Sequence, residues 1–355
     1  MADNLKIAIV VYTLSSGGLE RTVSNQTFLF EKMGYSIDLY VLEGEIDYSY
    51  TGNLFLFSLH KTKKIKEKIK QYNRLRALIQ KGNYDFIVDH RYRLNNFMEK
   101  IWYSYIYKNQ TLVYMVHSSD ISSYISNYLA KKQIHWICVS NALKDLLKKY
   151  YPKVKATTIY NFVQLEDSGK YQKKLSPAYI LAVGRMDNEN TKQFDVLIDC
   201  YAKSELPLRN IHLYILGSGE RKTFLQSKAH DYFCSNLIHF KGFETDLRLY
   251  YSNAKFLVLC SKYEGLGMVL VESLICGTPV ISYDCPVGPN EIIHHEYNGL
   301  LVENQNTEKL IHAMNRFVWD QELYKYCKKN ASNSVDRFSR NKVAEVWKNF
   351  FNDIR

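Results

Sequence analysis

Residues 263–285, "YEGLGMVLVESLICGTPVISYDC", carry the pattern that decides the fold. An apolar run that ends at Ser261 precedes this stretch, and its own "VISYD" is a second apolar run, so strand, loop, helix and strand are predicted in turn. The helix is expected over about 267–276, because Gly277 can end it and Pro279 cannot continue it. Such a unit is typical of a parallel sheet with helical connections.

The same stretch places two carboxylates in an otherwise apolar setting. Glu264 lies in the loop between strand and helix, and Glu272 lies more than one turn inside the helix. Gly265 and Gly267 would let a ligand approach bare backbone at the helix N-terminus, where free N–H groups favour a phosphate or an oxygen-rich sugar. The alternative is a capping carboxylate beside a surface glutamate.

Short apolar strands alternate with helical patterns along the rest of the chain. The predicted strands are 6–12, 37–42, 86–90, 111–117, 136–140 and 157–162, then 178–184, 211–217, 237–242, 255–261 and 278–284. Helices are predicted in the first half at 19–33, 65–79, 95–107 and 142–150. Near-continuous apolar strands joined by helices predict parallel sheets covered on both faces.

The length of 355 residues favours two domains, and the polar stretch 164–177 reads as the linker between them. We expect domains at 1–165 and 176–339. Ligands of doubly wound domains bind outside the carboxyl ends of the strands, so two such edges facing each other would form a binding cleft.

Composition excludes several classes of protein. Hydrophobic content of 46% with 23% charged residues is typical of a folded protein. Seven scattered cysteines without a C-x-x-C pair argue against a disulfide framework or a zinc site. No apolar run reaches the roughly 18 residues of a membrane span, and no cleavable leader is recognised, so we expect a cytoplasmic protein.

The net charge of +11 is concentrated in residues 61–81, which hold nine Lys or Arg and one acid. Ile65, Ile69, Tyr72 and Ile79 recur at helical spacing, which predicts an amphipathic helix with a basic face. Either this is a solvated helix face, or it attracts anionic lipid on the inner face of a membrane or a phosphorylated acceptor. Nucleic acid is not expected as a partner, because no recognised binding motif accompanies the patch.

The stretch "EGLGMVLVESLICGTPVI" resembles the E-x7-E segment of the retaining family 4 glycosyltransferases, which have the GT-B fold. Ser273, Leu274 and Ile275 depart from the usual A-M-A of that segment. The resemblance extends over about nine-tenths of the chain. It implies two Rossmann-like domains, with a last helix, 340–355, that packs back on the first domain.

A second segment, "AVGRMDNENTKQFDVLIDCYAK", supports the resemblance. Arg185 and Lys192 follow a predicted strand, and two cations there could neutralise a diphosphate leaving group. In the family the lysine follows the arginine by five residues; here it follows by seven, and Gln193 replaces a glycine. The alternative is a pair of surface cations.

Two further segments are similar to the family in the first half of the chain. Gly17 and Gly18 open a helix after the first strand, where the family makes room for donor phosphate and acceptor. His117 closes the strand 111–117, where the family places a histidine near the donor sugar. By themselves these features also fit a tight turn and a structural histidine.

Gly217 and Gly219 are interpreted as turn residues, because a dinucleotide fingerprint would need a third glycine at Lys222.

The resemblance implies a role for each of these residues. Glu272 would bind ribose hydroxyls, Glu264 the transferred sugar, and Arg185 with Lys192 the departing UDP, while His117 orients substrate. The backbone that would meet sugar and diphosphate is that of Leu266, Gly267, Met268 and Val269.

The chain has no D-x-D pair, the usual metal-binding motif of the other main glycosyltransferase fold, so no metal or other cofactor is expected. The sequence thus predicts a retaining hexosyltransferase that uses a UDP-sugar and a glycan or lipid-linked acceptor, in bacterial surface-polysaccharide or glycoconjugate synthesis. A sugar-nucleotide epimerase of the same fold and a non-catalytic partner subunit are the alternatives. Product analysis would separate the first from a transferase, and retention of Glu264, Glu272, Arg185 and Lys192 argues against the second.

Overall fold

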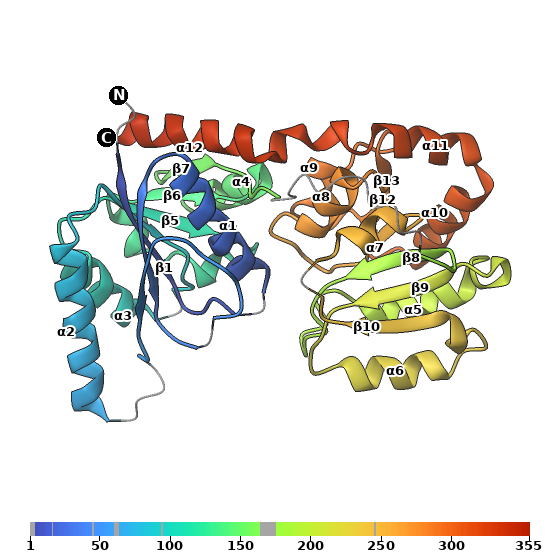
Figure 1. Ribbon diagram of the computed structural model, residues 1–355, viewed down its shortest axis with the longest axis horizontal. Helices are drawn as coiled ribbons and strands as arrows, with labels where there is room; N and C mark the ends of the chain where they lie inside the picture. Colours follow the sequence, from blue (N-terminus) through green and yellow to red (C-terminus); the bar gives the residue numbers. More distant parts are fainter. Residues whose placement is uncertain are drawn as a thin grey trace. The chain divides into compact units, whose positions relative to one another are not determined.

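The computed structural model describes residues 4–15, 17–44, 46–59, 64–93, 95–163, 175–244 and 246–355. The chain divides into two compact units. Unit 1 comprises Met1–Gln164 and Ser339–Arg355, and unit 2 comprises Leu165–Phe338. Each unit is an α/β layer structure built on one parallel sheet (Figure 1).

The described part of unit 1 contains a seven-stranded sheet in the order β3-β2-β1-β4-β5-β6-β7, and all of its pairings are parallel. Its strands are β1 (Lys6–Val11), β2 (Ser36–Val41), β3 (Asn53–Leu56), β4 (Phe86–Asp89), β5 (Leu112–Val116), β6 (His135–Cys138) and β7 (Lys155–Thr158). The strand order reverses between β1 and β4, which is the switch point of a doubly wound sheet.

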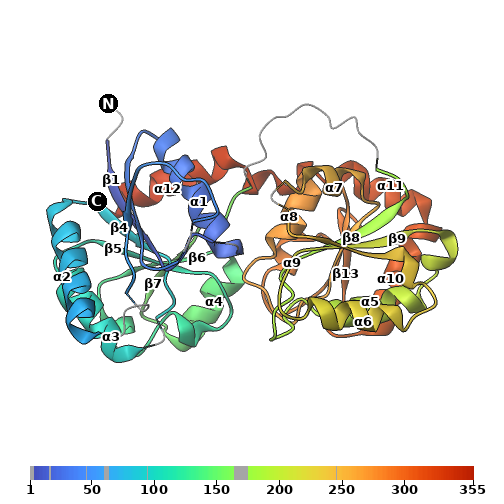
Figure 2. The ribbon, with the colours of Figure 1, turned by 60° about the horizontal axis from the view of Figure 1, so that its bottom comes forward.

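Helices cover both faces of this sheet. They are α1 (Gly18–Lys32), α2 (Ile65–Lys81), α3 (Asn96–Ile101), the π-helix η1 (Trp102–Ile106), the short 3₁₀ helices η2 (Ile121–Ser123) and η3 (Leu129–Lys131), α4 (Asn141–Tyr150) and α12 (Arg340–Ile354). Figure 2 shows α1 and α12 on one face and α2, α3 and α4 on the other. This distribution follows from right-handed crossovers that run in opposite directions from β1.

The described part of unit 2 contains a six-stranded parallel sheet in the order β10-β9-β8-β11-β12-β13, with its switch point between β8 and β11. Its strands are β8 (Tyr179–Val183), β9 (His212–Leu216), β10 (Ile238–Gly242), β11 (Leu257–Leu259), β12 (Val280–Tyr283) and β13 (Gly299–Val302). Its helices are α5 (Phe194–Lys203), η4 (Pro207–Arg209), α6 (Lys222–His230), η5 (Ser235–Leu237), α7 (Arg248–Asn253), α8 (Met268–Ile275), α9 (Pro289–Ile292), α10 (Thr307–Trp319), α11 (Gln321–Asn330) and η6 (Asn333–Phe338). An apolar core forms between the sheet and α5, α6 and α10.

Two features differ from the sequence prediction, namely two additional strands and the course of one helix. Strands β3 and β13 were not predicted, because "NLFL" and "GLLV" are four-residue edge segments without a distinct pattern. The helix expected over 95–107 is α-helical only to Ile101 and continues as a π-helical turn. Most of the stretch interpreted as a linker lies outside the described residues.

Helix α12 packs on unit 1 through aromatic side chains. Phe351 stacks on Phe86 of β4 with ring centroids 4.7 Å apart, and Trp347 meets Phe30 of α1 edge-on at 5.2 Å. Both α12 residues are almost completely buried. The last helix therefore belongs to the core of the first unit, although all of unit 2 separates them in the sequence.

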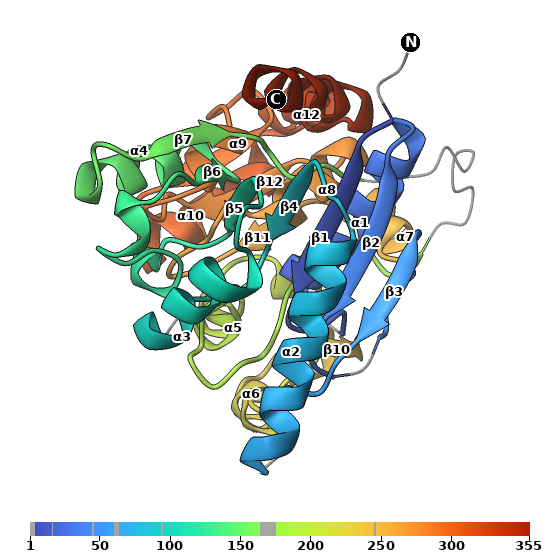
Figure 3. The same ribbon diagram turned by 90° about the vertical axis from the view of Figure 1, so that its left-hand side faces the viewer.

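The basic helix α2 packs on unit 1 only through its second half. Leu75 and Ile79 are fully buried, but Ile65 and Ile69 are 76% and 55% exposed. Figure 3 shows the first turns of α2 extending past the sheet. The predicted apolar face is thus not buried along its whole length, and residues 61–63 of the basic stretch lie outside the described residues.

Candidate functional site

Most of the predicted site residues follow the carboxyl ends of strands at a switch point or one strand away from it. In unit 2, Arg185 and Lys192 follow β8 and Glu264 follows β11, and these two strands are neighbours. In unit 1, Gly17 follows β1 and His117 follows β5. These are the edges at which doubly wound sheets bind ligands.

The structure brings Lys192 and Glu264 together. The Nζ of Lys192 lies 2.5 Å from Oε1 of Glu264, and Ser261 donates a hydrogen bond to the same oxygen at 2.6 Å. The two charged side chains are only 19% and 11% exposed. The Lys192 stem passes over Gly184, where an added Cβ would lie 2.9 Å from the lysine Cγ. Lys192 and Glu264 therefore form a partly buried ion pair at the carboxyl edge of the sheet.

The lengthened loop between Arg185 and Lys192 is held by the neighbouring loop after β11. The backbone N–H of Lys262 donates to the carbonyl of Thr191 at 2.9 Å. The Tyr263 hydroxyl donates to Oε2 of Glu189 at 2.9 Å. These bonds fix the end of the loop, so the two additional residues do not prevent Lys192 from reaching Glu264.

Gln193 is the N-cap of α5 and has a left-handed backbone, with φ of 48° and ψ of 45°. This conformation explains why glycine is favourable at this position, because a side chain in the left-handed region costs roughly 1–2 kcal/mol. The buried Gln193 side chain exchanges two hydrogen bonds with Gln305, at 3.0 and 2.8 Å. These bonds offset the unfavourable backbone.

Arg185 differs from Lys192 in its surroundings. Its side chain is exposed, and it makes no ion pair or side-chain hydrogen bond with any residue that the structure describes. A guanidinium in this position remains available to an anionic ligand.

Gly217 and Gly219 pack against the loop that carries Arg185. A Cβ at Gly217 would collide with the carbonyl of Gly184, and one at Gly219 would collide with the carbonyl of Met186. The backbone of the two loops is joined by a hydrogen bond from Met186 N–H to the Ser218 carbonyl at 2.8 Å. The two glycines therefore have the turn role that the sequence predicted.

The N-terminus of α8 is formed by the four backbone positions predicted to meet donor. Leu266 and Gly267 are buried, Met268 and Val269 begin the helix, and Gly267 caps it with φ of 90° and ψ of 53°. Gly288, with φ of 101°, lies so close that a Cβ there would collide with the Leu266 carbonyl. Glycine is required at both positions for the backbone to form this helix start.

Glu272 lies on α8 and is 5% exposed. The Tyr251 hydroxyl donates to its Oε2 at 2.7 Å. Glu272 also raises the pKa of the Cys276 thiol, although burial is the larger cause, so that this pKa is about 12. The second predicted carboxylate is therefore a buried group held by a tyrosine from α7, and not a surface glutamate.

In unit 1, Gly17 and Gly18 begin α1 after β1. A Cβ at Gly17 would collide with the carboxylate of Glu20, which also accepts a hydrogen bond from the Thr13 hydroxyl at 3.3 Å. A Cβ at Gly18 would meet no described atom within 4 Å. Since the end of the Glu20 side chain can move aside, packing against the described residues requires glycine at neither position.

His117 lies partly exposed at the end of β5 and is linked to a second histidine. Its Nε2 lies 2.9 Å from Nδ1 of His90, and the two rings stack with centroids 5.1 Å apart. His90 in turn contacts the Gln26 carboxamide oxygen through Nε2, at 2.7 Å. Burial, with Arg93 nearby, lowers the pKa of His117 to about 3, so the ring is neutral at pH 7.

A buried charge cluster behind these histidines was not predicted from the sequence. Arg91 lies 2.8 Å from Asp89 and 3.1 Å from Glu99, and Arg93 lies 3.4 Å from Asp89. The Arg91 guanidinium also covers the Trp102 ring at 3.6 Å. All four charged side chains are nearly inaccessible, and the two guanidinium groups balance the charge of the two carboxylates.

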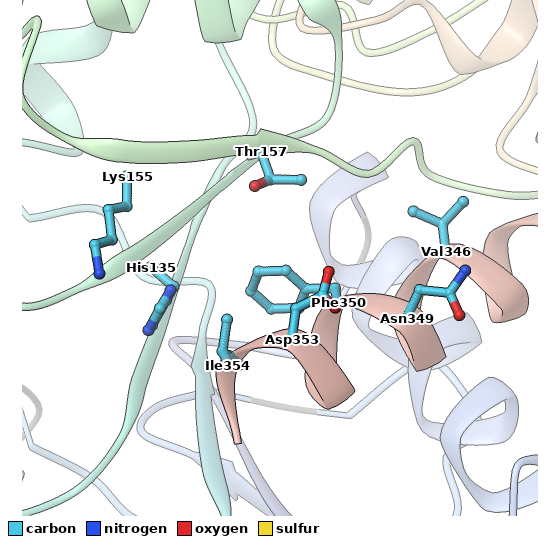
Figure 4. Close-up of a pocket in the computed structure, with 8 residues that line it drawn as sticks. All are labelled: His135, Lys155, Thr157, Val346, Asn349, Phe350, Asp353 and Ile354. Atoms are coloured by element: carbon cyan, nitrogen blue, oxygen red, sulfur yellow. The ribbon is translucent and has the colours of Figure 1, made fainter.

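One pocket lies away from these residues. It is lined by side chains from β6, β7 and α12 (Figure 4), namely His135, Lys155, Thr157, Val346, Asn349, Phe350, Asp353 and Ile354. The sites expected for a doubly wound sheet are at the carboxyl edge. None of the predicted site residues lines this pocket.

Metal-binding clusters and membrane-spanning helices are both absent from the described residues. Among them there is no group of three or more His, Cys, Asp or Glu side chains arranged to hold a metal ion. None of the helices within the described ranges combines the length and apolar character needed to cross a bilayer.

Two family models match adjacent parts of the chain. Glycosyltransferase Family 4 matches residues 16–167, and Glycosyl transferases group 1 matches residues 163–334. An uncharacterized glycosyltransferase of Haemophilus influenzae is 25% identical over 350 residues, covering 94% of this chain and 96% of the relative.

A second relative is the N-acetylgalactosamine-N,N'-diacetylbacillosaminyl-diphospho-undecaprenol 4-alpha-N-acetylgalactosaminyltransferase of Campylobacter jejuni. It is 25% identical over 362 residues, covering 96% of this chain and 97% of the relative. The solved structures include the pneumococcal O-GlcNAc transferase GtfA in complex with UDP and GlcNAc, with a TM-score of 0.80, 13% identity and 99% coverage of both chains. HepE of Anabaena in complex with UDP and glucose has a TM-score of 0.79 and 16% identity, covering 98% of this chain and 100% of HepE.

The two parallel-sheet units and these structural neighbours confirm the predicted GT-B fold. Together with the family matches, they define the protein as a glycosyltransferase. The chain belongs to the family 4-type glycosyltransferases.

Proposed function

We propose that this protein is a retaining glycosyltransferase that moves a hexose or N-acetylhexosamine from a UDP-sugar to a glycan or lipid-linked acceptor. The observation that carries the proposal is the grouping of Arg185, Lys192 and Glu264 after the two switch-point strands of unit 2. Unit 2 would bind the donor and unit 1 the acceptor, in bacterial surface-polysaccharide or glycoconjugate synthesis.

In the proposed reaction, the protein stabilises the negative charge that develops on the leaving diphosphate. Arg185 and Lys192 supply positive charge, and the backbone N–H groups at the start of α8 supply hydrogen bonds. These cations would replace a metal ion, so neither a metal nor another cofactor is required. Glu264 would accept hydrogen bonds from hydroxyls of the transferred sugar, and Glu272 from those of the ribose.

The mechanism that we favour is a front-face substitution. The leaving phosphate helps to deprotonate the acceptor hydroxyl, and the new bond forms on the face from which UDP departs, so the configuration is retained. The name of the Campylobacter relative describes an α-linked product, which requires retention if its donor is an α-linked nucleotide sugar. The same name describes a diphospho-undecaprenol acceptor, which supports a lipid-linked glycan as the acceptor class here.

Calorimetric titration with UDP, GDP, ADP and NAD, without added metal, tests the donor. We expect preferential UDP binding that is lost in Glu272→Ala. Preference for GDP or ADP would change the donor, and the absence of any nucleotide binding would contradict an active UDP-dependent enzyme. Product analysis by NMR would then determine whether the anomeric configuration is retained.

Arg185→Ala tests the electrostatic role. Removing a group that stabilises developing negative charge costs about 3–4 kcal/mol of transition-state stabilisation. Turnover should therefore fall by about two to three orders of magnitude. Arg209→Ala is the control, because Arg209 is a half-exposed arginine of the same unit that pairs with Glu205. Transfer by Arg185→Ala at the rate of that control would refute the assignment.

We further propose that the start of α2 binds an anionic membrane surface on the cytoplasmic side. Ile65 and Ile69 are exposed there, with Lys64, Lys66 and Lys70 around them. Exposed apolar side chains surrounded by lysines favour an interface in which the chains enter the lipid and the ammonium groups meet anionic headgroups. A lipid-linked acceptor would be reached from such a surface.

Flotation with vesicles of phosphatidylglycerol and phosphatidylcholine tests this proposal. We expect binding that falls in the double variant Ile65→Ser/Ile69→Ser and that disappears with phosphatidylcholine alone. Leu208→Ser, which changes a 78% exposed leucine of unit 2, is the matched control. Equal flotation of all three proteins would show that α2 is only a solvated helix.

A further inference from the structure

Three uncharged side chains form a hydrogen-bonded chain across the carboxyl edge of the unit 1 sheet. Gln26 comes from α1, His90 follows β4, and His117 follows β5. Gln26 and His90 are buried, whereas His117 is partly exposed. The chain therefore runs from the interior to the surface that carries the candidate site.

The contacts determine which ring nitrogens carry hydrogen. The Gln26 carboxamide oxygen can only accept, so Nε2 of His90 must donate to it across 2.7 Å. A neutral imidazole has one hydrogen, so Nδ1 of His90 is then an acceptor. The hydrogen in the 2.9 Å contact between the rings must come from Nε2 of His117, which leaves a lone pair on Nδ1 of His117.

Burial and a nearby positive charge both favour neutral rings. Desolvation is the main cause that lowers the pKa of both histidines, and the buried Arg93 guanidinium lowers each further. Two protonated rings would place donors opposite each other in the stacked pair, with no acceptor between them.

No described protein group is hydrogen-bonded to Nδ1 of His117. We propose that Gln26 and His90 are positioning residues that hold His117 in the tautomer with hydrogen on Nε2, so that Nδ1 accepts a hydrogen bond from a sugar hydroxyl. The identity of this donor as a sugar hydroxyl rests on the proposed function. His117 in this state has no proton to give to a leaving group, so it binds and orients substrate.

Nitrogen-15 NMR of the full chain labelled in its histidine rings tests the tautomer at pH 7 without any ligand. Comparison with His117→Asn assigns the His117 signals. We expect Nδ1 of His117 to have the shift of an unprotonated ring nitrogen and Nε2 that of a protonated one. The reverse pattern, or a cationic ring, would overturn the proposal even if the Gln26 variant failed to fold.

Gln26→Met tests the role of the buried amide, because methionine retains the shape but cannot accept the hydrogen bond from His90. We expect the Nδ1 shift of His117 to move toward the average of its two forms. Gln80→Met is the matched control, since Gln80 is a partly buried glutamine of the same unit that bonds to the carbonyls of Ile106 and Lys108. An unchanged His117 tautomer in folded Gln26→Met would refute the positioning role.

Addition of UDP separates this proposal from the proposed function. The tautomer is a property of unit 1 and is measured without nucleotide, whereas UDP binding is assigned to unit 2. The expected tautomer without UDP binding would leave the positioning role intact and refute the donor assignment. UDP binding with the opposite tautomer would refute the positioning role alone.

Discussion

Replacing Lys192 by methionine and Glu264 by glutamine, singly and together, separates the mutual attraction of these two groups from their roles toward substrate. Methionine retains most of the stem that passes over Gly184, and glutamine retains an oxygen that can accept from Ser261. The variants therefore remove charge with little change in volume. Each single variant leaves the other charge partly buried without its partner.

The magnitude follows from the geometry of the pair. At 2.5 Å and an effective dielectric constant of about 20, the Coulomb attraction is about 7 kcal/mol. Desolvation of the two ions offsets most of this attraction. Because the side chains are 19% and 11% exposed, we expect a coupling free energy of about 2 kcal/mol, between that of surface pairs and that of fully buried ones.

Urea denaturation followed by circular dichroism gives the free energy of unfolding of the four proteins, and the double-mutant cycle gives the coupling. UDP affinity by calorimetry is the second measurement. It should fall in Lys192→Met and change little in Glu264→Gln, since only the lysine is assigned to the diphosphate. A coupling below about 0.5 kcal/mol would refute the interpretation of this contact as a significant ion pair.

Three further predictions concern stability. Arg91→Met should destabilise unit 1 by about 3–5 kcal/mol in urea denaturation, because it leaves the buried Glu99 without a cation and Asp89 with Arg93 alone. The folded-state pKa of His90 and of His117 is lowered, so the unfolded state binds more protons below pH 6.5 and stability falls with acid, by at most about 1.4 kcal/mol per pH unit for each ring. For His117 this loss should level off near pH 3, and a variant with glutamine at both positions should lack it. Gln193→Gly removes backbone strain but also both bonds to Gln305, and thermal denaturation should show a net loss of about 1–2 kcal/mol.

The sequence was sufficient to predict elements whose pattern is local. The strand, loop and helix around Glu264 follow from an apolar run, two glycines and a stop signal, and α8 begins at Met268 as expected to within one residue. The position of Lys192 was harder to predict from the sequence. It depends on hydrogen bonds between two loops, such as that from Lys262 to Thr191, which leave no pattern in the sequence.

The contact between His90 and His117 was also only partly predictable from the sequence. His90 closes its strand as His117 does, and β4 and β5 are neighbours, so the similar endings "VDH" and "MVH" were a usable signal for two adjacent rings. Gln26 had no such signal, because a glutamine within a helix is usually solvated. Its role appears only when the burial of α1 places it against His90.

The packing of α12 on unit 1 has a consequence for synthesis of the chain. Phe30 and Phe86 emerge from the ribosome early, but their partners Trp347 and Phe351 follow only after all of unit 2. At 5–20 residues per second, the interval between Phe86 and Phe351 is roughly 13–53 s, which is long compared with the folding of a domain. The nascent first unit therefore carries an uncovered aromatic surface for that time, and the second unit is the first to have its complete set of residues.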